Sequence, residues 1–451
     1  RSAWSMLKAM RRATYLLVLA FCLIHCGDSG TSNSTLDAGA SIDSAPAVAP
    51  DANSEPSPSE AFYDPSTIVE VRLTASPADI ATLDNNPFAD VYVPATFTWQ
   101  GQEVANVGLR YKGNSSLARA GEKPSLKIKF NEFSQAQRFL GLTKVNFNNS
   151  VLDPSMQRET TAYGLFRDFG VPAPRANYAK VYLNGQYSGL YVNVEQVDKR
   201  ALTRLFGDNS GNLYKQYSGA SLEYRGASPA AYDDGTYRKK TNEIEDDWGD
   251  LIALTQLLDS SDSATIEAEL PKMLDVSLYL RWLAVNTYLS HIDAYTGFAN
   301  NYYLYRNPTT MKFVYIPWDL DITFGTQGHA NTTDSFLLNW DLFDPQIPSP
   351  TGPRPMLTKL MAIASFRTEY TGYLVELVDG GQIESRILSQ LDEVRAKITD
   401  AATTDTSKPY TNSEFLSSLV SGVPAPGDTL PVIGIRNFVE QRTANVLSQL
   451  P

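Results

Sequence analysis

The sequence predicts an α+β fold, with a β-rich N-terminal lobe that contains one main helix and a helical C-terminal lobe. Apolar and polar residues alternate from Thr67 onward, which indicates strands in which every second side chain faces the core. After residue 245, apolar residues recur at helical spacing in five long segments. The chain is 43% hydrophobic and 11% aromatic, which is enough apolar material for a large core.

The first strands are predicted in "IVEVRLTA" and in "VYVPATFTWQGQEVANVGLRYKGN", which Gly101 and Gly113 interrupt. The segment "PSLKIKF" is a further strand, in which the two-residue period separates two faces. One face holds apolar side chains and the other holds a serine and two lysines: Leu126, Ile128 and Phe130 against Ser125, Lys127 and Lys129. Both lysines therefore point out of the same face.

The main helix of the first lobe is predicted in "DPSMQRETTAYGLFRDFG", with Asp153 as N-cap, Pro154 at the first helical position and an end at Gly170. The next segment, "NYAKVYLNGQYSGLYVNVEQ", reads as two strands joined at Asn184-Gly185, which is a strong hairpin signal. A short helix in "VDKRALTRLFG" follows.

The chain after residue 240 is predicted to be mostly helical apart from one hairpin. A polar stretch rich in Tyr and Gly over residues 216–240 precedes it. The hairpin consists of "NNYYLYRNP" and "KFVYIPWDL", with a turn between them at "NPTTM". No internal repeat is visible.

The first 62 residues differ from the rest in composition. Residues 1–26 combine a basic start with an apolar stretch of signal-peptide length, and "LIHC" followed by Gly27 resembles a bacterial lipobox around Cys26. Residues 27–62 form a Ser/Ala/Pro-rich linker predicted to be disordered. We therefore expect an exported lipoprotein that contacts the membrane only through an N-terminal lipid anchor. The folded domain is predicted over 63–451, with lobes at 63–197 and 198–451.

Composition excludes some classes of function. Both cysteines, Cys22 and Cys26, lie before the folded domain, so that domain has no thiol chemistry and no cysteine metal site. The net charge is −12 and no basic stripe is visible in the sequence. An acidic surface repels phosphate backbones, so we expect no nucleic-acid partner.

Oxygen-bearing side chains gather around the predicted hairpin of the second lobe. Asp293 follows a helix, Asn300 and Asn301 open the first strand, and Asp319 closes the second. Such a set suits a hard cation such as Mg²⁺, with one carboxylate left to act as general base. Alternatively, Asp293, Asp319 and Asp321 are loop and cap residues that form turn hydrogen bonds. A third interpretation takes Asp319-Leu-Asp321 as the metal signature of a glycosyltransferase.

The order of elements is that of an atypical protein-kinase-like, two-lobed fold. In that architecture Lys127 or Lys129 would hold nucleotide phosphates, and Glu159 on the main helix would pair with the lysine. Asp293 would orient or deprotonate the acceptor hydroxyl, while Asn301 and Asp319 would hold metal. No Gly-x-Gly-x-x-Gly loop is present, and "YKGNSS", with Asn114 and Ser115, is the only candidate to cover the phosphates.

Several motifs together resemble one family. They are "LRYKGNSS", "KPSLKIKF", the stretch from Asp153 to Arg200, "GNLYK", "NNYYLY" and "IPWDLDITFG". The chain is similar in these segments to the CotH kinase family, named for spore coat protein H. The resemblance implies an atypical secreted or surface kinase that uses ATP with Mg²⁺ or Mn²⁺. It also implies that Asp293 is catalytic and that Asp319 binds metal, with Asp321 in the same motif.

The expected function is therefore ATP- and Mg²⁺-dependent phosphate transfer to serine or threonine hydroxyls of exported, cell-surface or coat proteins. Two other functions stay open: a non-catalytic surface module or pseudokinase, and a metal-dependent glycosyltransferase. His291 is interpreted as a helix-end histidine with satisfied hydrogen bonds rather than as a catalytic acid or ligand. Trp318 and Phe324 are interpreted as packing residues rather than substrate contacts.

Overall fold

The computed structural model describes residues 57–245, 247–326, 333–347, 352–428 and 430–451. The predicted signal peptide, the lipobox and most of the predicted linker lie outside these residues. Residues 57–62, which the sequence assigns to the linker, pack against the first sheet. Phe62 is fully buried there, and its carbonyl accepts hydrogen bonds from the side chains of Asn177 and Asn193.

The N-terminal part is a closed barrel of seven strands in the order β1-β2-β3-β4-β5-β7-β6. The strands are β1 (Ile68–Thr74), β2 (Val93–Trp99), β3 (Gln102–Lys112), β4 (Ser125–Lys129), β5 (Lys144–Asn148), β6 (Ala176–Leu183) and β7 (Gln186–Val194). A parallel pairing of β1 with β6 closes the barrel, whereas the other pairings are antiparallel. The predicted hairpin at Asn184-Gly185 joins β6 to β7.

Aromatic rings fill the barrel. Phe97 and Phe139 lie 4.8 Å apart between ring centroids, and Phe130 lies 5.1 Å from Phe97. Leu126, Ile128 and Phe130 all face this core, as their alternation predicts. The opposite face of β4 presents Lys127 and Lys129.

Helix α4 (Arg158–Asp168) is the predicted main helix, but it begins four residues later than expected. Asp153 is not its N-cap. Its carboxylate instead accepts hydrogen bonds from the backbone and hydroxyl of Ser155 and from the backbone of Arg158, which folds residues 153–157 into a turn. Two shorter helices, α2 (Pro77–Asn85) and α3 (Ser115–Arg119), were not predicted from the sequence.

A second sheet has four strands in the order β11-β10-β8-β9. The predicted hairpin is confirmed as β10 (Tyr302–Asn307) and β11 (Lys312–Pro317). Strands β8 (Leu213–Gln216) and β9 (Tyr237–Lys239), at the two ends of the polar stretch, were not predicted and extend this sheet. The expectation that only the β10–β11 hairpin interrupts the helices after that stretch was wrong because of another strand pair. Two further short strands pair with each other, β12 (Val423–Pro424) and β13 (Pro431–Val432).

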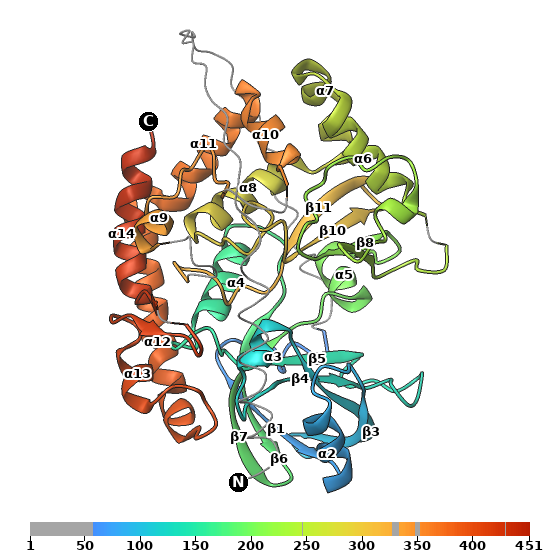
Figure 1. Cartoon of the computed structure of the whole chain (residues 1–451), viewed down its shortest axis with the longest axis vertical. Coiled ribbons are helices and arrows are strands. Elements are labelled where there is room, and N and C mark those ends of the chain that lie inside the picture. The colour runs from blue at the N-terminus through green and yellow to red at the C-terminus, as the bar shows by residue number, and fades with distance from the viewer. Residues whose placement is uncertain (1–56, 246, 327–332, 348–351, 429) are drawn as a thin grey trace. The chain divides into compact units, whose positions relative to one another are not determined.

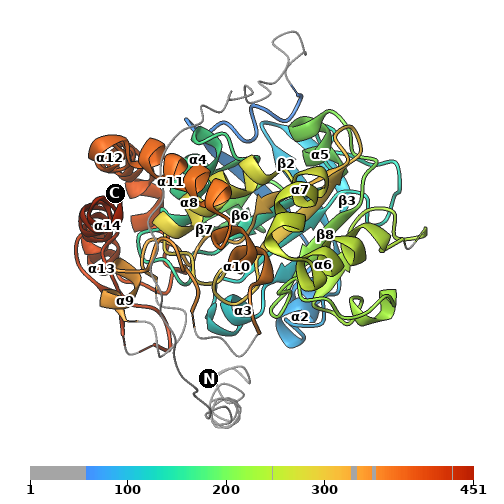
Figure 2. The same ribbon diagram turned by 90° about the horizontal axis from the view of Figure 1, so that it is seen from above.

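Helices make up most of the remainder, as predicted. They are α5 (Lys199–Phe206), α6 (Gly249–Ser260), α7 (Ser263–Met273), α8 (Val276–Tyr288), α9 (Asp334–Leu338), α10 (Pro355–Met361), α11 (Ala364–Val378), α12 (Gln382–Thr404), α13 (Asn412–Ser417) and α14 (Ile435–Gln449), with 3-10 turns at Pro229–Ala231 and Asp379–Gly381. Figures 1 and 2 show that α8, α10 and α11 lie together above the barrel, while α12 and α14 run side by side. Within the described residues, no helix combines the length and apolar character needed to cross a membrane.

Strands β6 and β7 serve two hydrophobic cores. Ala179, Val181 and Tyr191 face the barrel core, whereas Tyr178 and Val192 face the core that the helices and second sheet build. Both faces of this hairpin are therefore buried, which fixes its register, because a one-residue shift would exchange the two faces. The α+β class, with a large sheet first and helices after it, is confirmed.

Candidate active site

Asp293 lies in a tight loop between α8 and β10. The loop closes on itself through backbone hydrogen bonds from Phe298 to Ile292 (3.0 Å) and from Asn300 to Ala294 (3.3 Å). Gly297 makes this closure possible, because a Cβ there would come within 1.7 Å of the Ile292 carbonyl oxygen. The chain returns sharply enough to bring the start of β10 back to Asp293.

Two amides hold the Asp293 carboxylate. Asn300 Nδ2 donates to Oδ1 at 3.0 Å, and Asn301 Nδ2 donates to Oδ2 at 2.8 Å. Removal from water raises the pKa of Asp293 to about 7; the negative charge of Asp319 also raises it, and the two amide hydrogen bonds lower it. A carboxylate with a pKa near neutrality can take a proton from a substrate and return it to solvent.

A buried arginine anchors the same loop. Arg354, 1% exposed, donates from Nε to the Tyr295 carbonyl and from Nη2 to the Gly297 carbonyl. Its guanidinium therefore fixes two backbone positions just after Asp293. This arginine precedes α10 and was not singled out in the sequence.

Asp319 follows β11 with a left-handed backbone, at φ +59°. A non-glycine residue in this region is strained unless its surroundings hold it there. Its backbone N–H donates to the Tyr163 hydroxyl of α4 at 3.1 Å, and the His291 ring forms a hydrogen bond to its backbone. Burial lowers the pKa of His291 to about 3, so its ring is neutral and supports Asp319 without adding charge.

Asp321 belongs to the same group of carboxylates. Burial raises its pKa well above the ordinary value, and the charges of Asp319, Glu159 and Asp293 raise it further. The predicted residues Asp293, Asp319 and Asp321 are thus close enough to act on one another. As whole residues, all three are intermediate in solvent exposure, although the Asp293 and Asp321 carboxylates are buried.

Glu159 approaches this group from α4 and is 3% exposed. Both of its carboxylate oxygens accept from Asn148 Nδ2 at 2.9 Å, and the Lys112 ammonium donates to the other end of that amide. Burial and then the charge of Asp319 raise the pKa of Glu159 to about 8. The predicted lysine partner of Glu159 was wrong, because Asn148 bridges it to Lys112 rather than to Lys127 or Lys129.

Lys127 and Lys129 have different surroundings although they share a face of β4. Burial lowers the pKa of Lys127 well below its ordinary value. Four neighbouring cations lower it further: Lys112, Lys144, Lys215 and Arg110. Lys129 forms an ion pair with Glu132 at 2.6 Å and is 30% exposed. Lys127 therefore belongs to a group of cations. Lys129 is not part of this group, and its charge is balanced by Glu132.

The candidate phosphate-covering segment is not a glycine-rich loop. Strand β3 runs to Lys112, Gly113 turns the chain at φ +105°, and α3 begins at Ser115 with Asn114 as its N-cap residue. The Asn114 side chain makes no capping hydrogen bond. Both predicted residues thus follow Lys112 after a single glycine, Gly113.

The arrangement fits a metal only together with an anionic ligand. In the described part of the chain, no three Asp, Glu, His or Cys side chains form a ready metal site. Mg²⁺ at nucleotide sites usually takes one or two carboxylates and completes its shell with phosphate oxygens and water. Asp319 and Asp321 meet that requirement, since a cation would relieve their mutual repulsion. The amide nitrogen of Asn301 is held by Asp293, which leaves its carbonyl oxygen for a metal.

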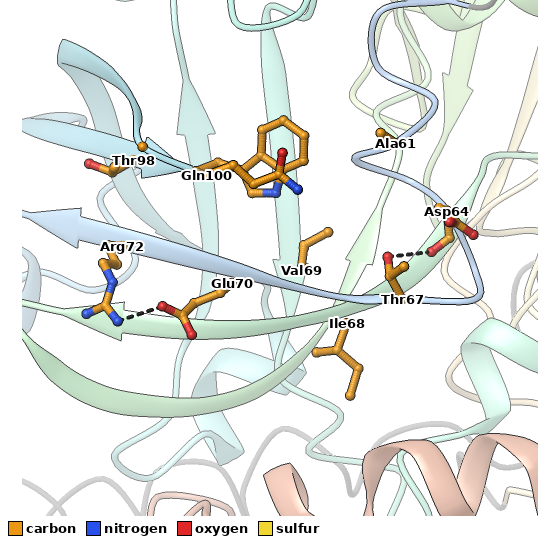
Figure 3. Close-up of a pocket in the computed structure, with 11 residues that line it drawn as sticks. Ala61, Asp64, Thr67, Ile68, Val69, Glu70, Arg72, Thr98 and Gln100 are labelled. Carbon is orange, nitrogen blue, oxygen red and sulfur yellow. Dashed lines mark hydrogen bonds and ion pairs between the residues drawn. The ribbon is translucent and has the colours of Figure 1, made fainter.

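A hollow beside β1 contains none of these residues. Figure 3 shows its lining, where Arg72 pairs with Glu70 at 2.6 Å and the Thr67 hydroxyl donates to the Asp64 carbonyl at 3.2 Å. The buried charges needed for catalysis are absent from this lining, so the carboxylate and lysine group is the better candidate.

Sequence reasoning missed three members of the candidate site: Lys112, Asn148 and Lys215. Lys112 and Lys215 lie inside the quoted motifs "YKGNSS" and "GNLYK". Their place in these motifs could have distinguished them from the other lysines, which their charge alone could not. Asn148 ends β5, and only the pairing of β5 inside the barrel brings it between Lys112 and Glu159.

Comparisons with known proteins agree with these motifs. The family model described as CotH kinase protein matches residues 109–446. Inner spore coat protein H of Bacillus subtilis is 30% identical over 263 residues, which cover 57% of this chain and 70% of that protein. Invasin CotH2 of Rhizopus delemar is 23% identical over 236 residues, or 50% of this chain and 39% of that protein. A solved structure of the Helicobacter pylori proinflammatory kinase CtkA matches 66% of this chain and 93% of its own at 13% identity, with a TM-score of 0.24.

Proposed function

The chain belongs to the CotH kinase family, and we propose that it transfers the γ-phosphate of ATP to a serine or threonine hydroxyl of an exported protein. One observation carries this proposal beyond family membership. Four carboxylates that repel one another, Asp293, Asp319, Asp321 and Glu159, lie beside lysines that repel one another. A metal ion bound to an anionic polyphosphate would neutralise both groups at once.

Asp293 would act as the general base. As the acceptor hydroxyl oxygen attacks the γ-phosphorus, its proton passes to a carboxylate oxygen of Asp293, and the bond to the β–γ bridging oxygen breaks to release ADP. Asn300 and Asn301 orient the carboxylate for this step, because each fixes one of its oxygens.

Asp319 and Asp321, with the carbonyl oxygen of Asn301, would hold Mg²⁺ or Mn²⁺. Bound metal supplies neutralisation of the negative charge that develops on the transferring phosphoryl group. Lys127 and Lys112 would contact the phosphates, and Glu159 would position Lys112 through Asn148. Asn114 and Ser115 would cover the phosphates from the start of α3.

The acceptor is proposed to be an exported or coat protein, because one relative is named as an inner spore coat protein. The predicted signal peptide and lipobox support export and attachment through a lipid anchor. The chain's acidic balance of −12 supports a protein acceptor rather than a nucleic acid.

The direct test is transfer of label from γ-labelled ATP, in the presence of Mg²⁺ or Mn²⁺, to the protein itself or to a casein acceptor. We expect transfer by the wild type and its loss in Asp319→Asn. Asp379→Asn is the matched control, because Asp379 is exposed and has a left-handed backbone that asparagine tolerates well. Absence of transfer together with absence of metal-dependent ATP binding would reject the proposal in favour of a surface-binding module. Preference for a nucleotide sugar over ATP would instead identify a glycosyltransferase.

A further inference from the structure

Lys215 is one of the cations near the candidate site to which the proposed mechanism gives no role. It lies on β8 of the second sheet, opposite Tyr303 of β10. Its ammonium lies over three aromatic rings, at 4.8 Å from the centroid of Tyr217, 5.4 Å from Trp318 and 5.9 Å from Tyr303. The rings hold the side chain in place, and Trp318 directly precedes Asp319.

The Lys215 ammonium forms no ion pair with a carboxylate in the part of the chain that the structure describes. Among the described residues, no acceptor forms a hydrogen bond with its Nζ either. The charge of Asp319 acts on it favourably, whereas Arg238 and Arg110 repel it. Contacts with aromatic faces offset only part of the cost of removing an ammonium from water.

Lys215 also acts on Lys127, which projects from the barrel. Two ammonium groups from different sheets are therefore close enough to repel each other, and Lys215 also interacts with Asp319, a proposed metal ligand. Folding alone does not favour such a pair, since two like charges at short range destabilise the folded chain. An anion between them would attract both ammonium groups and so outweigh their mutual repulsion.

We propose that Lys215 contacts the phosphates of the nucleotide together with Lys127, so that the two sheets bracket the polyphosphate. The proposal rests on the proposed function and extends it by a phosphate-binding residue from the second sheet. A lysine suits this position because its ammonium is a compact charge that can face phosphate oxygens from several directions.

The test compares Lys215→Met with wild type for binding of ATP and of adenosine in the presence of Mg²⁺. Methionine keeps an unbranched apolar stem over the rings and removes the charge. We expect ATP to bind at least about tenfold more weakly, as for the loss of a hydrogen bond to a charged group. Adenosine, which has no phosphate, should bind within threefold of wild type.

Two variants serve as controls. Lys215→Arg should retain more ATP affinity than Lys215→Met because it keeps the charge. Lys312→Met, at the far end of the same sheet, should bind ATP like wild type. Without ligand, Lys215→Met should unfold at the same temperature as wild type or higher, because a repelled cation is removed; a purely structural lysine would lower it.

The outcomes separate the two proposals. Unchanged ATP binding by Lys215→Met, or equal weakening of ATP and adenosine, would overturn the role of Lys215 and leave the proposed function standing. A wild type that binds no ATP at all would overturn the proposed function and this inference together.

Discussion

At the scale of single residues, the candidate site is an assembly of charges that the protein alone does not balance. The folded protein raises the pKa of Asp293 to about 7 and that of Glu159 to about 8, in both cases chiefly by burial. In unfolded chains these groups have pKa values of roughly 3.9 and 4.3. The folded state therefore holds protons that the unfolded state has already released at neutral pH.

This difference predicts how stability depends on pH in the absence of nucleotide and metal. Because the folded pKa values are raised, the stabilisation is complete below about pH 4 for these two groups and is lost as pH rises through 7 and 8. The unfolding temperature should fall between pH 5 and pH 8, as measured by scanning calorimetry. The double variant Asp293→Asn/Glu159→Gln should show a shallower fall. An equal slope in that variant would mean that other groups cause the dependence.

The sequence predicted the aspartates of the candidate site but not which lysine belongs to it. Asp293, Asp319 and Asp321 were identified from their places around one hairpin, and the structure brings them together. The sequence could not show whether Lys127 or Lys129 binds phosphate, because the two-residue side-chain period of a strand puts both on one face. Only the folded barrel shows that Lys129 meets Glu132 while Lys127 joins the other cations.

At the scale of elements, helix α4 carries Glu159 and also contacts the segment that contains Asp319 and Asp321. Arg158, which is fully buried, pairs with Asp153 at 2.8 Å and donates to the Thr323 carbonyl just after Asp321. One turn further along the helix, Tyr163 accepts from the backbone of Asp319. A shift of this helix would therefore move Asp319, so the position of α4 and the geometry of the site are coupled.

Tyr163→Phe tests this coupling. The change removes the acceptor for the Asp319 N–H, a loss of about 1 kcal/mol for a neutral hydrogen bond. We expect label transfer at saturating ATP to fall about fivefold while the unfolding temperature changes by only a few degrees. The matched control is Tyr187→Phe, which removes a hydroxyl that donates to Ala401 away from the site. Equal rates for both variants would argue against a role of α4 in holding Asp319.

The elements show a second limit of the sequence. The β10–β11 hairpin and α4 were predicted because each has a strong local signal. Strands β8 and β9 were missed, because each is at most four residues long and is stabilised by pairing with distant segments. The late start of α4 was missed because Asp153 binds Ser155 and Arg158 in a turn that the N-cap pattern does not distinguish.

At the scale of the whole folded part, a buried ion pair fastens the barrel to the C-terminal segment. Lys123 and Asp405 are fully buried and 2.6 Å apart, and Lys123 also donates to the Leu190 carbonyl. The Asp405 carboxylate accepts from the backbone N–H of Leu190 as well. Gly189 leaves room for it, since a Cβ there would lie 2.4 Å from Asp405 Oδ2.

Loss of one partner of this pair should be costly. Lys123→Met leaves the Asp405 charge buried without its cation, and we expect a loss of about 3–5 kcal/mol in the free energy of unfolding. Lys272→Met, in the exposed pair with Glu269, should change it by less than about 1 kcal/mol. Denaturant unfolding measures both. A loss below 1 kcal/mol in Lys123→Met would contradict a tethering role.

At the scale of the whole fold, closure of the barrel could not be predicted from the sequence. Alternation predicted the strands, but the parallel pairing of β1 with β6 joins segments more than a hundred residues apart, and no local pattern encodes it. The antiparallel pairing of β3 with β4 places Lys112 and Lys127 on neighbouring strands, and so contributes to a cationic group within a chain of net charge −12.

The central claim is that Asp293 accepts the proton while other residues bind the nucleotide. Its most direct test is the rate of phosphate transfer by Asp293→Asn at saturating ATP and Mg²⁺, with ATP affinity measured on the same protein. We predict a rate about a hundredfold or more below wild type, as for loss of a general base, with ATP affinity within threefold. Transfer at the wild-type rate by Asp293→Asn would contradict the claim.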